Sequence, residues 1–152
     1  MKQITGNFWD EIKNYDAICV TTNGIVKSDG CLVMGTGIAK DFKERYKYIK
    51  LDYQLGQKVK EYGNFVMHVP LFFPDKPFGI FSIPTKNDWK NPSDIELIKT
   101  SCITLSYLAS QYGYDSVLLT RLGCGNGGLT WDSVCPIIAP ILDDRFTVIN
   151  KE

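Results

Sequence analysis

The stretch "RLGCGNGGL" (residues 121–129) follows directly after "YDSVLLT" (residues 114–120), a short apolar run that predicts a buried strand. It holds four glycines, one Asn and one Cys. Glycine adopts backbone angles with positive φ and lets another group approach the main chain. The next segment, "TWDSVCPIIAPILDD" (residues 130–144), predicts a helix interrupted by prolines. The sequence therefore predicts a strand, a loop of bare backbone and a helix, in that order.

A second loop containing glycines also joins a predicted strand to a predicted helix. "NGIVKSDGCLVMGTGIA" (residues 23–39) follows the β-forming run "YDAICVTT" (residues 15–22). It leads into "GIAKDFKERYKYI" (residues 37–49), which repeats apolar residues at four-residue steps and has lysines between them. That spacing is typical of an amphipathic helix. The same strand–loop–helix unit is thus predicted twice.

Two such loops at one edge of a sheet would suit a diphosphate. Successive amide groups in a glycine loop form a concavity that binds anions, and the start of a helix adds free N–H donors. The dinucleotide fingerprint G-x-G-x-x-G fails, because Lys40 occupies the position of its third glycine, and no P-loop sequence is present. The alternative is that both loops are only tight turns between a strand and a helix.

The middle of the chain predicts one more helical segment and two strands. "IKLDYQLGQKVKEYG" (residues 49–63) continues the preceding helix and ends at Gly63, a suitable C-terminal cap. "NFVMHVPLFF" (residues 64–73) and "FGIFSIP" (residues 78–84) are expected to be strands, separated by the turn-forming "PDKP" (residues 74–77).

The remaining segments complete an alternating pattern. "PSDIELIKTSCITLSYLASQYG" (residues 92–113) predicts a helix, with Ser93 as its cap and Glu96 three residues later as in a capping box. "RFTVIN" (residues 145–150) predicts a final strand. Alternation of strands and helices predicts an α/β fold with helices on both faces of a central sheet. In such sheets ligands bind beyond the carboxyl ends of the strands.

Length, composition and charge are those of an ordinary folded domain. The 152 residues predict a single domain, residues 1–152. The 17 basic and 17 acidic residues give no net charge, which argues against a general nucleic-acid binder but not against a local site for a modified nucleic acid. The polar start "MKQITGNFWDEI" (residues 1–12) and the lack of a long apolar run predict a cytoplasmic protein with no membrane partner. A monomer is the expected state.

Cysteine and histidine usage argues against a metal site. No two cysteines have the C-x-x-C spacing and His68 is the only histidine, so we expect no metal, no cofactor and no disulfide. Cys124 lies in the second loop but has no neighbouring histidine that would activate it as a nucleophile. His68 lies in a predicted strand, where a structural role is expected.

Several motifs resemble the macrodomain family, which binds ADP-ribose. They are "ITGNF" (residues 4–8), "DAICVTTN" (residues 16–23), "MGTGIAKDFKERY" (residues 34–46) and "RLGCGNGGLTWDSV" (residues 121–134). "IPTKNDWKNPSDIELI" (residues 83–98) resembles macrodomains that remove ADP-ribose from nucleic acid or from acidic side chains. It is similar above all to the antitoxin type that reverses thymidine-linked ADP-ribosylation of DNA.

The resemblance implies a three-layer α/β/α sandwich with a central mixed sheet, in which the two glycine loops surround the ADP-ribose diphosphate. Asn7 and Phe8 match the positions that hold the adenine, although most members have Asp at the first of them. Asn23 matches the Asn that reaches the distal ribose. The implied ADP-ribose-binding residues are Asn7, Phe8, Asn23, Met34, Gly35, Thr36, Gly37, Ile38, Gly123, Cys124, Gly125, Asn126, Gly127, Gly128 and Leu129.

By the same resemblance Lys86 is the catalytic candidate, together with Asn23. The matching lysine acts at the anomeric carbon of the distal ribose, where an amine can be a nucleophile, protonate a leaving group or stabilise negative charge. Read from the residues alone, Lys86 is expected to be a solvated lysine after a strand rather than a catalytic one. A related hydrolase has Asp where this chain has Gly127. Asp29 in the first loop is either a substitute for that acid or a turn former.

Three functions follow from the resemblance. The first is a hydrolase that releases ADP-ribose from a modified substrate, either DNA or an acidic protein side chain. The second is a phosphatase acting on ADP-ribose 1″-phosphate, and the third is a non-catalytic reader of ADP-ribose. Trp89 and Trp131 flank the predicted site, and each is expected either to pack against a loop or to stack on a base.

Overall fold

The computed structural model describes residues 1–73 and 76–151, so Pro74 and Asp75 of the predicted "PDKP" turn and the final Glu152 lie outside the described residues. Within this part the strands form one mixed sheet of six strands, in the order β1-β6-β5-β2-β4-β3. All neighbours are parallel except β3 and β4. The strands are β1 (Lys2–Thr5), β2 (Ala17–Thr22), β3 (Met67–Phe73), β4 (Lys76–Pro84), β5 (Val117–Thr120) and β6 (Phe146–Asn150).

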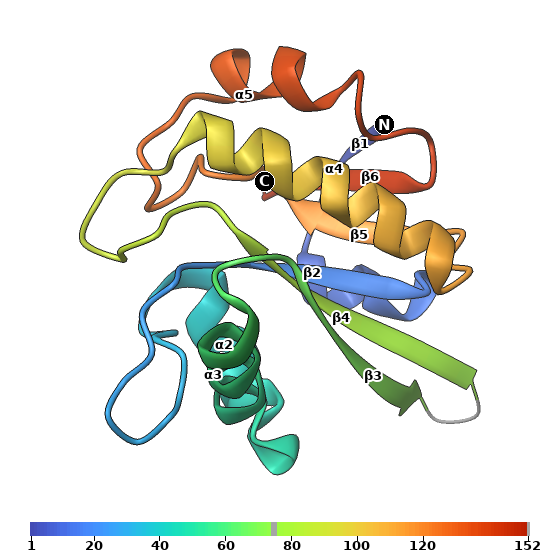
Figure 1. Ribbon diagram of the computed structural model, residues 1–152. Coiled ribbons are helices and arrows are strands. Elements are labelled where there is room, and N and C mark those ends of the chain that lie inside the picture. Colours follow the sequence, from blue (N-terminus) through green and yellow to red (C-terminus); the bar gives the residue numbers. More distant parts are fainter. Residues whose placement is uncertain (74–75, 152) are drawn as a thin grey trace.

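Helices cover both faces of this sheet, which confirms the predicted three-layer α/β/α sandwich. In Figure 1, α2 and α3 lie on one side of the strands, and α4 and α5 lie on the other. The helices are α1 (Phe8–Glu11), α2 (Gly37–Arg45), α3 (Leu51–Tyr62), α4 (Ile95–Gln111) and α5 (Trp131–Ile138), with short 3-10 turns at η1 (Ile12–Asn14) and η2 (Lys47–Ile49). No helix in the described ranges has the length and apolar character that crossing a bilayer requires.

The apolar runs of the sequence are explained by burial on both faces of the sheet. In β2, Ala17 and Cys19 belong to the hydrophobic cluster under α4 and α5. Ile18 and Val20 belong to the cluster under α2 and α3. Successive side chains of a strand point to opposite faces, so a strand buried on both faces reads as a continuous apolar run.

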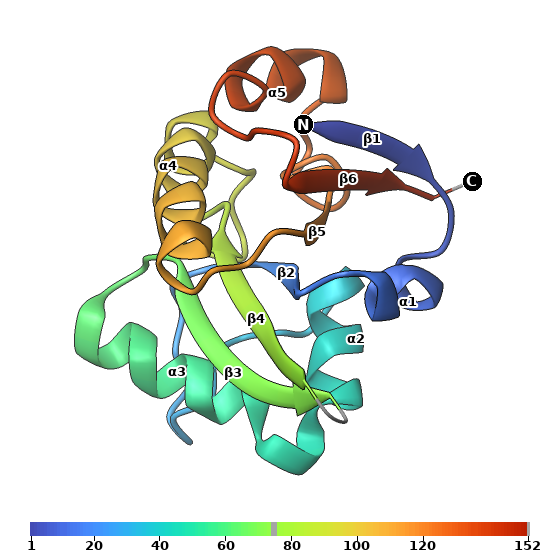
Figure 2. The same ribbon diagram turned by 90° about the vertical axis from the view of Figure 1, so that its right-hand side faces the viewer.

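The first and last strands lie side by side, as Figure 2 shows. The chain leaves β1 at its carboxyl end, where the Gly6 N–H donates to the Asn150 carbonyl at 2.9 Å. Asn7 follows and caps α1, because its side chain accepts a hydrogen bond from the Trp9 amide. The N-terminal segment is thereby brought to the same edge of the sheet as the ends of the central strands.

One helical prediction is wrong in its extent. Residues 37–63 form two helices rather than one, because α2 ends at Arg45 and α3 begins at Leu51. Between them Lys50 has a left-handed backbone with φ 54, which an α-helix cannot contain. The predicted stop is confirmed, since Gly63 ends α3 with φ 94.

The break turns α3 so that its Gly56 packs directly against the first glycine loop. A Cβ at Gly56 would overlap the Gly30 carbonyl oxygen and lie 2.7 Å from the Leu32 nitrogen. The Leu32 N–H donates to the Asp52 carbonyl at 2.9 Å, which fixes this contact. A backbone cannot move aside as a flexible side chain can, so only glycine fits here.

We therefore expect Gly56→Ala to lower the free energy of unfolding by about 1–3 kcal/mol, the usual effect of overpacking. Urea denaturation followed by circular dichroism measures it. Lys60→Ala, at an exposed position of the same helix, is the matched control and should leave stability within about 0.5 kcal/mol. Equal stability of Gly56→Ala and the wild type would contradict the packing described.

Candidate ligand-binding site

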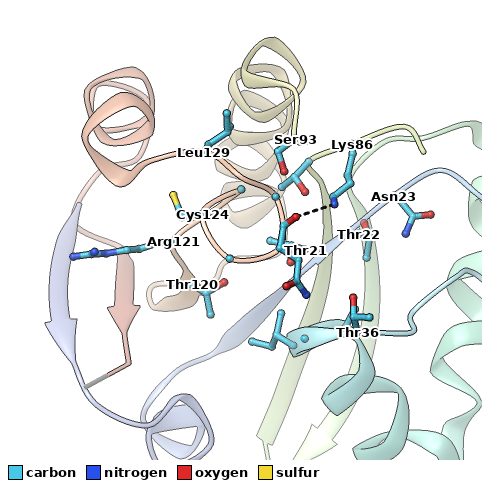
Figure 3. Close-up of a pocket in the computed structure, with 18 of the residues that line it drawn as sticks. Thr21, Thr22, Asn23, Thr36, Lys86, Ser93, Thr120, Arg121, Cys124 and Leu129 are labelled. Carbon is cyan, nitrogen blue, oxygen red and sulfur yellow. Dashed lines mark hydrogen bonds between the residues drawn. The ribbon is translucent and has the colours of Figure 1, made fainter. Parts of the chain in front are cut away.

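A cleft of about 830 Å³ lies at the carboxyl edge of the sheet (Figure 3). Each of its walls continues one of the parallel strands: Asn23 follows β2, Arg121 follows β5 and Lys151 follows β6. Lys86 follows β4 two residues after its end. The cleft therefore lies where the parallel strands end, the place at which the sequence predicts a ligand site.

Both glycine loops line this cleft and meet across it. A Cβ at Gly37 of the first loop would lie 3.2 Å from Asn126 Nδ2 of the second. Most of the predicted set lines the cleft: Asn23, Met34, Gly35, Thr36, Gly37, Ile38, Lys86, Gly123, Cys124, Gly125, Asn126, Gly127 and Leu129. Gly128 does not line it, and serves the turn through its φ of 77 instead.

Asn7 and Phe8 lie beside the cleft rather than in it. They line a neighbouring hollow of about 440 Å³. The two spaces share four lining residues: Ile38, Thr120, Ile149 and Lys151. The cleft and the hollow are therefore adjacent, and the hollow lies at one end of the cleft.

Asn23 stabilises the first loop through two hydrogen bonds to the loop backbone. Its Nδ2 donates to the Val33 carbonyl at 3.0 Å, and its Oδ1 accepts from the Ile25 N–H at 2.9 Å. The side chain is buried, and these bonds hold the two limbs of the loop together. An amide nitrogen has two hydrogens, so one N–H of Asn23 remains for a ligand.

The first loop ends in a helix start whose amides are free to bind an anion. Thr36 is the N-cap of α2, but its side chain makes no capping hydrogen bond, and no acidic residue lies in the first turn of the helix. By contrast, the α5 N-cap Thr130 accepts from the Ser133 amide. Uncapped N–H groups and the helix dipole together favour a negative charge at this position.

The second loop is held in shape by its own backbone and by the segment before α4. Leu129 N–H donates to the Gly123 carbonyl at 2.9 Å, and Ser93 N–H donates to the Gly127 carbonyl at 2.8 Å. Gly127 is fixed by packing, because a Cβ there would overlap Ser93 Oγ. At Gly125, which is exposed in the cleft, a Cβ would meet no other heavy atom within 4 Å.

The predicted capping role of Ser93 is wrong. Asp94 is the N-cap of α4, and its carboxylate accepts from the amides of Glu96 and Leu97. Ser93 lies one residue earlier, buried against the second loop, and its hydroxyl has no hydrogen-bond partner among the residues described. Ser93 and Asp94 are adjacent in the sequence, and either residue type can cap a helix. The hydrogen bond from the Ser93 N–H to the Gly127 carbonyl holds Ser93 before the helix, so Asp94 is the cap.

Lys86 connects the segment after β4 with both loops. Its Nζ donates to the Asn126 carbonyl at 3.5 Å, as the dashed line in Figure 3 marks. Its own carbonyl accepts from Asn64 Nδ2 at 3.1 Å. The next residue, Asn87, accepts from the Gly24 N–H at 2.9 Å. The Lys86 side chain is therefore placed over the second loop, and the neighbouring Asn87 ties the same segment to the first loop.

Charge in the cleft is positive. The cleft contains three basic side chains, those of Lys86, Arg121 and Lys151, and no carboxylate among the described residues that line it. In the part of the chain that the structure describes, no group of His, Cys, Asp and Glu could hold a metal ion. The site therefore suits an anion held by amides and basic side chains.

Asp29 does not supply the acid that Gly127 lacks. It lies outside the cleft-lining residues, and its Oδ1 accepts from the Cys31 N–H at 3.0 Å. This hydrogen bond from the Cys31 backbone lowers the pKa of Asp29. Lys27 Nζ lies 3.9 Å from Asp29 Oδ2. Because its carboxylate bonds within its own turn and does not line the cleft, Asp29 is a turn former.

Cys124 and His68 each have a hydrogen-bond partner elsewhere in the fold. Burial raises the pKa of the Cys124 thiol, whose Sγ donates to the Leu122 carbonyl at 3.4 Å. His68 lies on β3, away from the cleft, with its Nε2 2.7 Å from the Tyr114 hydroxyl. Burial lowers the pKa of His68 to about 4, so its ring is neutral at pH 7.

Sequence reasoning did not single out Arg121, which lines the cleft, or Asn64, which holds Lys86 from outside the cleft lining. Arg121 lies over the Trp131 ring, 5.2 Å from its centroid. Trp131 Nε1 donates to Gln3 Oε1 at 3.1 Å, so this indole packs between strand and helix. Asn64, which holds Lys86, gave no signal because a lone Asn after a glycine cap reads as a loop residue.

Comparison with known proteins gives a consistent set of relatives, although no family model matches the chain. It is 34% identical over 123 residues to the DNA ADP-ribosyl glycohydrolases of Mycobacterium tuberculosis and Mycobacterium bovis. The match takes in 78% of this chain but spans only about a third, 34%, of those relatives. The Thermus aquaticus DNA ADP-ribosyl glycohydrolase is 35% identical over 107 residues, 67% of this chain and 29% of that protein.

Solved structures agree over the full length of the chain. The macrodomain of Mycobacterium tuberculosis DarG superposes with a TM-score of 0.76 at 27% identity, covering 100% of both chains. The macrodomain of Thermus aquaticus DarG gives a TM-score of 0.77 at 28% identity, covering 99% of this chain and 97% of that chain.

The second loop offers a matched pair of glycines for mutation. We expect Gly127→Ala to lower the free energy of unfolding by about 1–3 kcal/mol, because its Cβ overlaps Ser93 Oγ. Gly125→Ala should change it by less than about 0.5 kcal/mol, because the added methyl enters open space. Thermal and urea unfolding of the two variants measure the contrast, and equal effects would contradict the geometry of the loop.

Proposed function

Because this chain belongs to the macrodomain family, we propose that it binds ADP-ribose and hydrolyses the bond joining ADP-ribose to a base of DNA. The observation that carries the proposal is Lys86, whose Nζ reaches over the second glycine loop to the Asn126 carbonyl at 3.5 Å. The relatives named DNA ADP-ribosyl glycohydrolase support the same activity.

The diphosphate would lie between the two glycine loops. The amides of Gly35 to Ile38 at the uncapped start of α2 would bind one phosphate, and the amides of residues 125–127 the other. Gly128, whose N–H donates to the Gly125 carbonyl at 3.4 Å, would shape the loop that presents these amides. The positive charge of the cleft, with no carboxylate among its described lining residues, supports this arrangement.

The adenine would occupy the hollow beside the cleft. Asn7 Oδ1 already accepts from the Trp9 amide at 2.9 Å, so the remaining N–H groups and lone pair of Asn7 would meet the base. Phe8 is buried in edge contact with Trp9, with the ring centroids 5.0 Å apart, and would form a wall of the hollow.

The distal ribose would then lie between Asn23 and Lys86. Attack of the Lys86 amine on the anomeric carbon forms a C–N bond to the lysine and breaks the bond to the DNA base. The base leaves with the bonding electron pair and takes up the proton that the lysine nitrogen loses. Water then displaces the lysine from the same carbon, which releases ADP-ribose and restores the amine.

The test is release of ADP-ribose from DNA carrying ADP-ribosylated thymidine. We expect Lys86→Ala to lower the rate about 10²- to 10⁴-fold. Lys86→Arg should be equally inactive, because arginine keeps the charge but cannot act as an amine nucleophile. The matched control is Lys99→Ala, an exposed lysine of α4 outside the cleft, which should retain the wild-type rate.

Two parallel assays separate the alternatives. ADP-ribosylated carboxylate protein and ADP-ribose 1″-phosphate are offered to the same variants. Phosphate released from the second compound with none of the DNA cleaved would identify a phosphatase. ADP-ribose binding with every substrate intact would identify a reader. Undiminished activity of Lys86→Ala on DNA would exclude the role given to Lys86.

A separate prediction concerns the diphosphate. Gly35 and Gly125 are exposed in the cleft, and neither Cβ would meet another heavy atom within 4 Å, so the fold does not require glycine at these positions. We expect Gly35→Ala and Gly125→Ala to fold normally but to bind ADP-ribose about tenfold or more weakly, since each methyl stands where the phosphate approaches the backbone. Isothermal titration calorimetry measures the affinity. Unchanged affinity in both variants would argue against binding of the diphosphate between the two glycine loops.

A further inference from the structure

Trp89 is an exposed indole on the rim of the cleft. It lies three residues after Lys86 and lines the same cleft, yet 51% of its surface is open to solvent. The other two tryptophans are packed. Trp9 contacts the tilted Phe42 ring and has the Arg45 guanidinium over its own ring, and Trp131 is held by Arg121 and Gln3. Two of the three tryptophans are therefore packed within the fold, and the third lies in the same cleft as Lys86.

The segment that carries Trp89 is fixed at both ends. Thr85 N–H donates to the Thr22 carbonyl at 3.0 Å, and Asp94 N–H donates to the Thr85 carbonyl at 2.8 Å. At the tip, Asp88 closes a turn by accepting from the Lys90 amide at 3.0 Å. The indole is thus presented on a loop whose base is hydrogen-bonded to the sheet edge.

Its position places Trp89 on the leaving-group side. The hollow around Asn7 and Phe8 marks one end of the site, and neither Trp89 nor Lys86 lines it. If adenine occupies that hollow, the group attached to the distal ribose must extend past Lys86, and Trp89 is the large side chain that lines the cleft there. Lys90 Nζ lies 5.6 Å from the Trp89 ring centroid and adds a positive charge to the same rim.

We infer that Trp89 stacks on the base from which ADP-ribose is released, so that the site selects base-linked over carboxylate-linked ADP-ribose. A flat aromatic face stacks on any nucleobase, and a neighbouring lysine suits the backbone phosphate of a nucleic acid. A carboxylate linkage on a protein side chain offers no ring to stack. The inference rests on the proposed function, because it assumes that ADP-ribose lies in the cleft with its distal ribose at Lys86.

Binding to the inert Lys86→Ala variant tests the inference without catalysis. Calorimetry compares ADP-ribose with a short single-stranded oligonucleotide carrying ADP-ribosylated thymidine. We expect the oligonucleotide to bind about ten- to a hundredfold more tightly than ADP-ribose, the range of one base–aromatic stack. Adding Trp89→Ala should abolish that difference and leave the affinity for ADP-ribose unchanged within about twofold.

Two further variants make the result specific. Trp89→Phe keeps an aromatic face and should retain most of the difference. Tyr107→Ala removes an aromatic ring that is 62% exposed on α4, outside the cleft, and should have no effect. An unchanged preference for the oligonucleotide in Trp89→Ala would overturn the inference. So would an equal loss of affinity for both ligands, because the indole would then only brace the site.

Failure of the proposed function would look different. Wild-type protein that binds ADP-ribose but releases none from DNA would exclude the hydrolase, while the affinity comparison would still decide whether Trp89 stacks on a base. With an active enzyme, Trp89→Ala should lower kcat/KM about ten- to a hundredfold on ADP-ribosylated DNA. It should leave any cleavage of ADP-ribosylated carboxylate protein unchanged, and an equal loss on both substrates would contradict the inference.

Discussion

The site depends on backbone hydrogen bonds that hold two glycine loops face to face at one edge of the sheet. The first loop is closed by Asn23, which bonds to the backbone at residues 25 and 33. The second is held by Ser93, whose amide bonds to Gly127. Lys86 lies between the two, because its side chain reaches Asn126 of the second loop while the next residue, Asn87, accepts from the Gly24 N–H of the first. Unpaired amides at the start of α2 are free for an anion because these other bonds already fix the loops.

The same arrangement explains which glycines serve the fold and which serve the ligand. Gly56 and Gly127 leave no space for a side chain, since their neighbours are a backbone carbonyl and a buried hydroxyl. Gly35 and Gly125 face open space in the cleft. The fold does not require glycine at these two positions. Because they lie in a positively charged cleft beside an uncapped helix, they point to a ligand that approaches the main chain.

The sequence predicted the layers, the strands from β2 onward and the meeting of the two loops, because burial and glycine leave strong local signals. The residue pattern did not predict β1, whose residues are mostly exposed and form no apolar run. It could not place Ser93, since Asp94 is an equally good cap and only the contact with Gly127 decides between them. The break at Lys50 was missed because a lysine with φ 54 gives no signal in the residue pattern. Asn64 and Trp131 reach their partners only through the tertiary fold. The roles of Lys86, Asn7 and Phe8 came from the resemblance and not from spacing, and they stay predictions.

The most direct test of the account is the structure of this chain bound to ADP-ribose. The account predicts phosphate oxygens within hydrogen-bond distance of amides in both loops, residues 35–38 and 125–127, with the anomeric carbon of the distal ribose beside Lys86 Nζ. A diphosphate bound outside the cleft, or held by only one loop with the distal ribose turned away from Lys86, would contradict it.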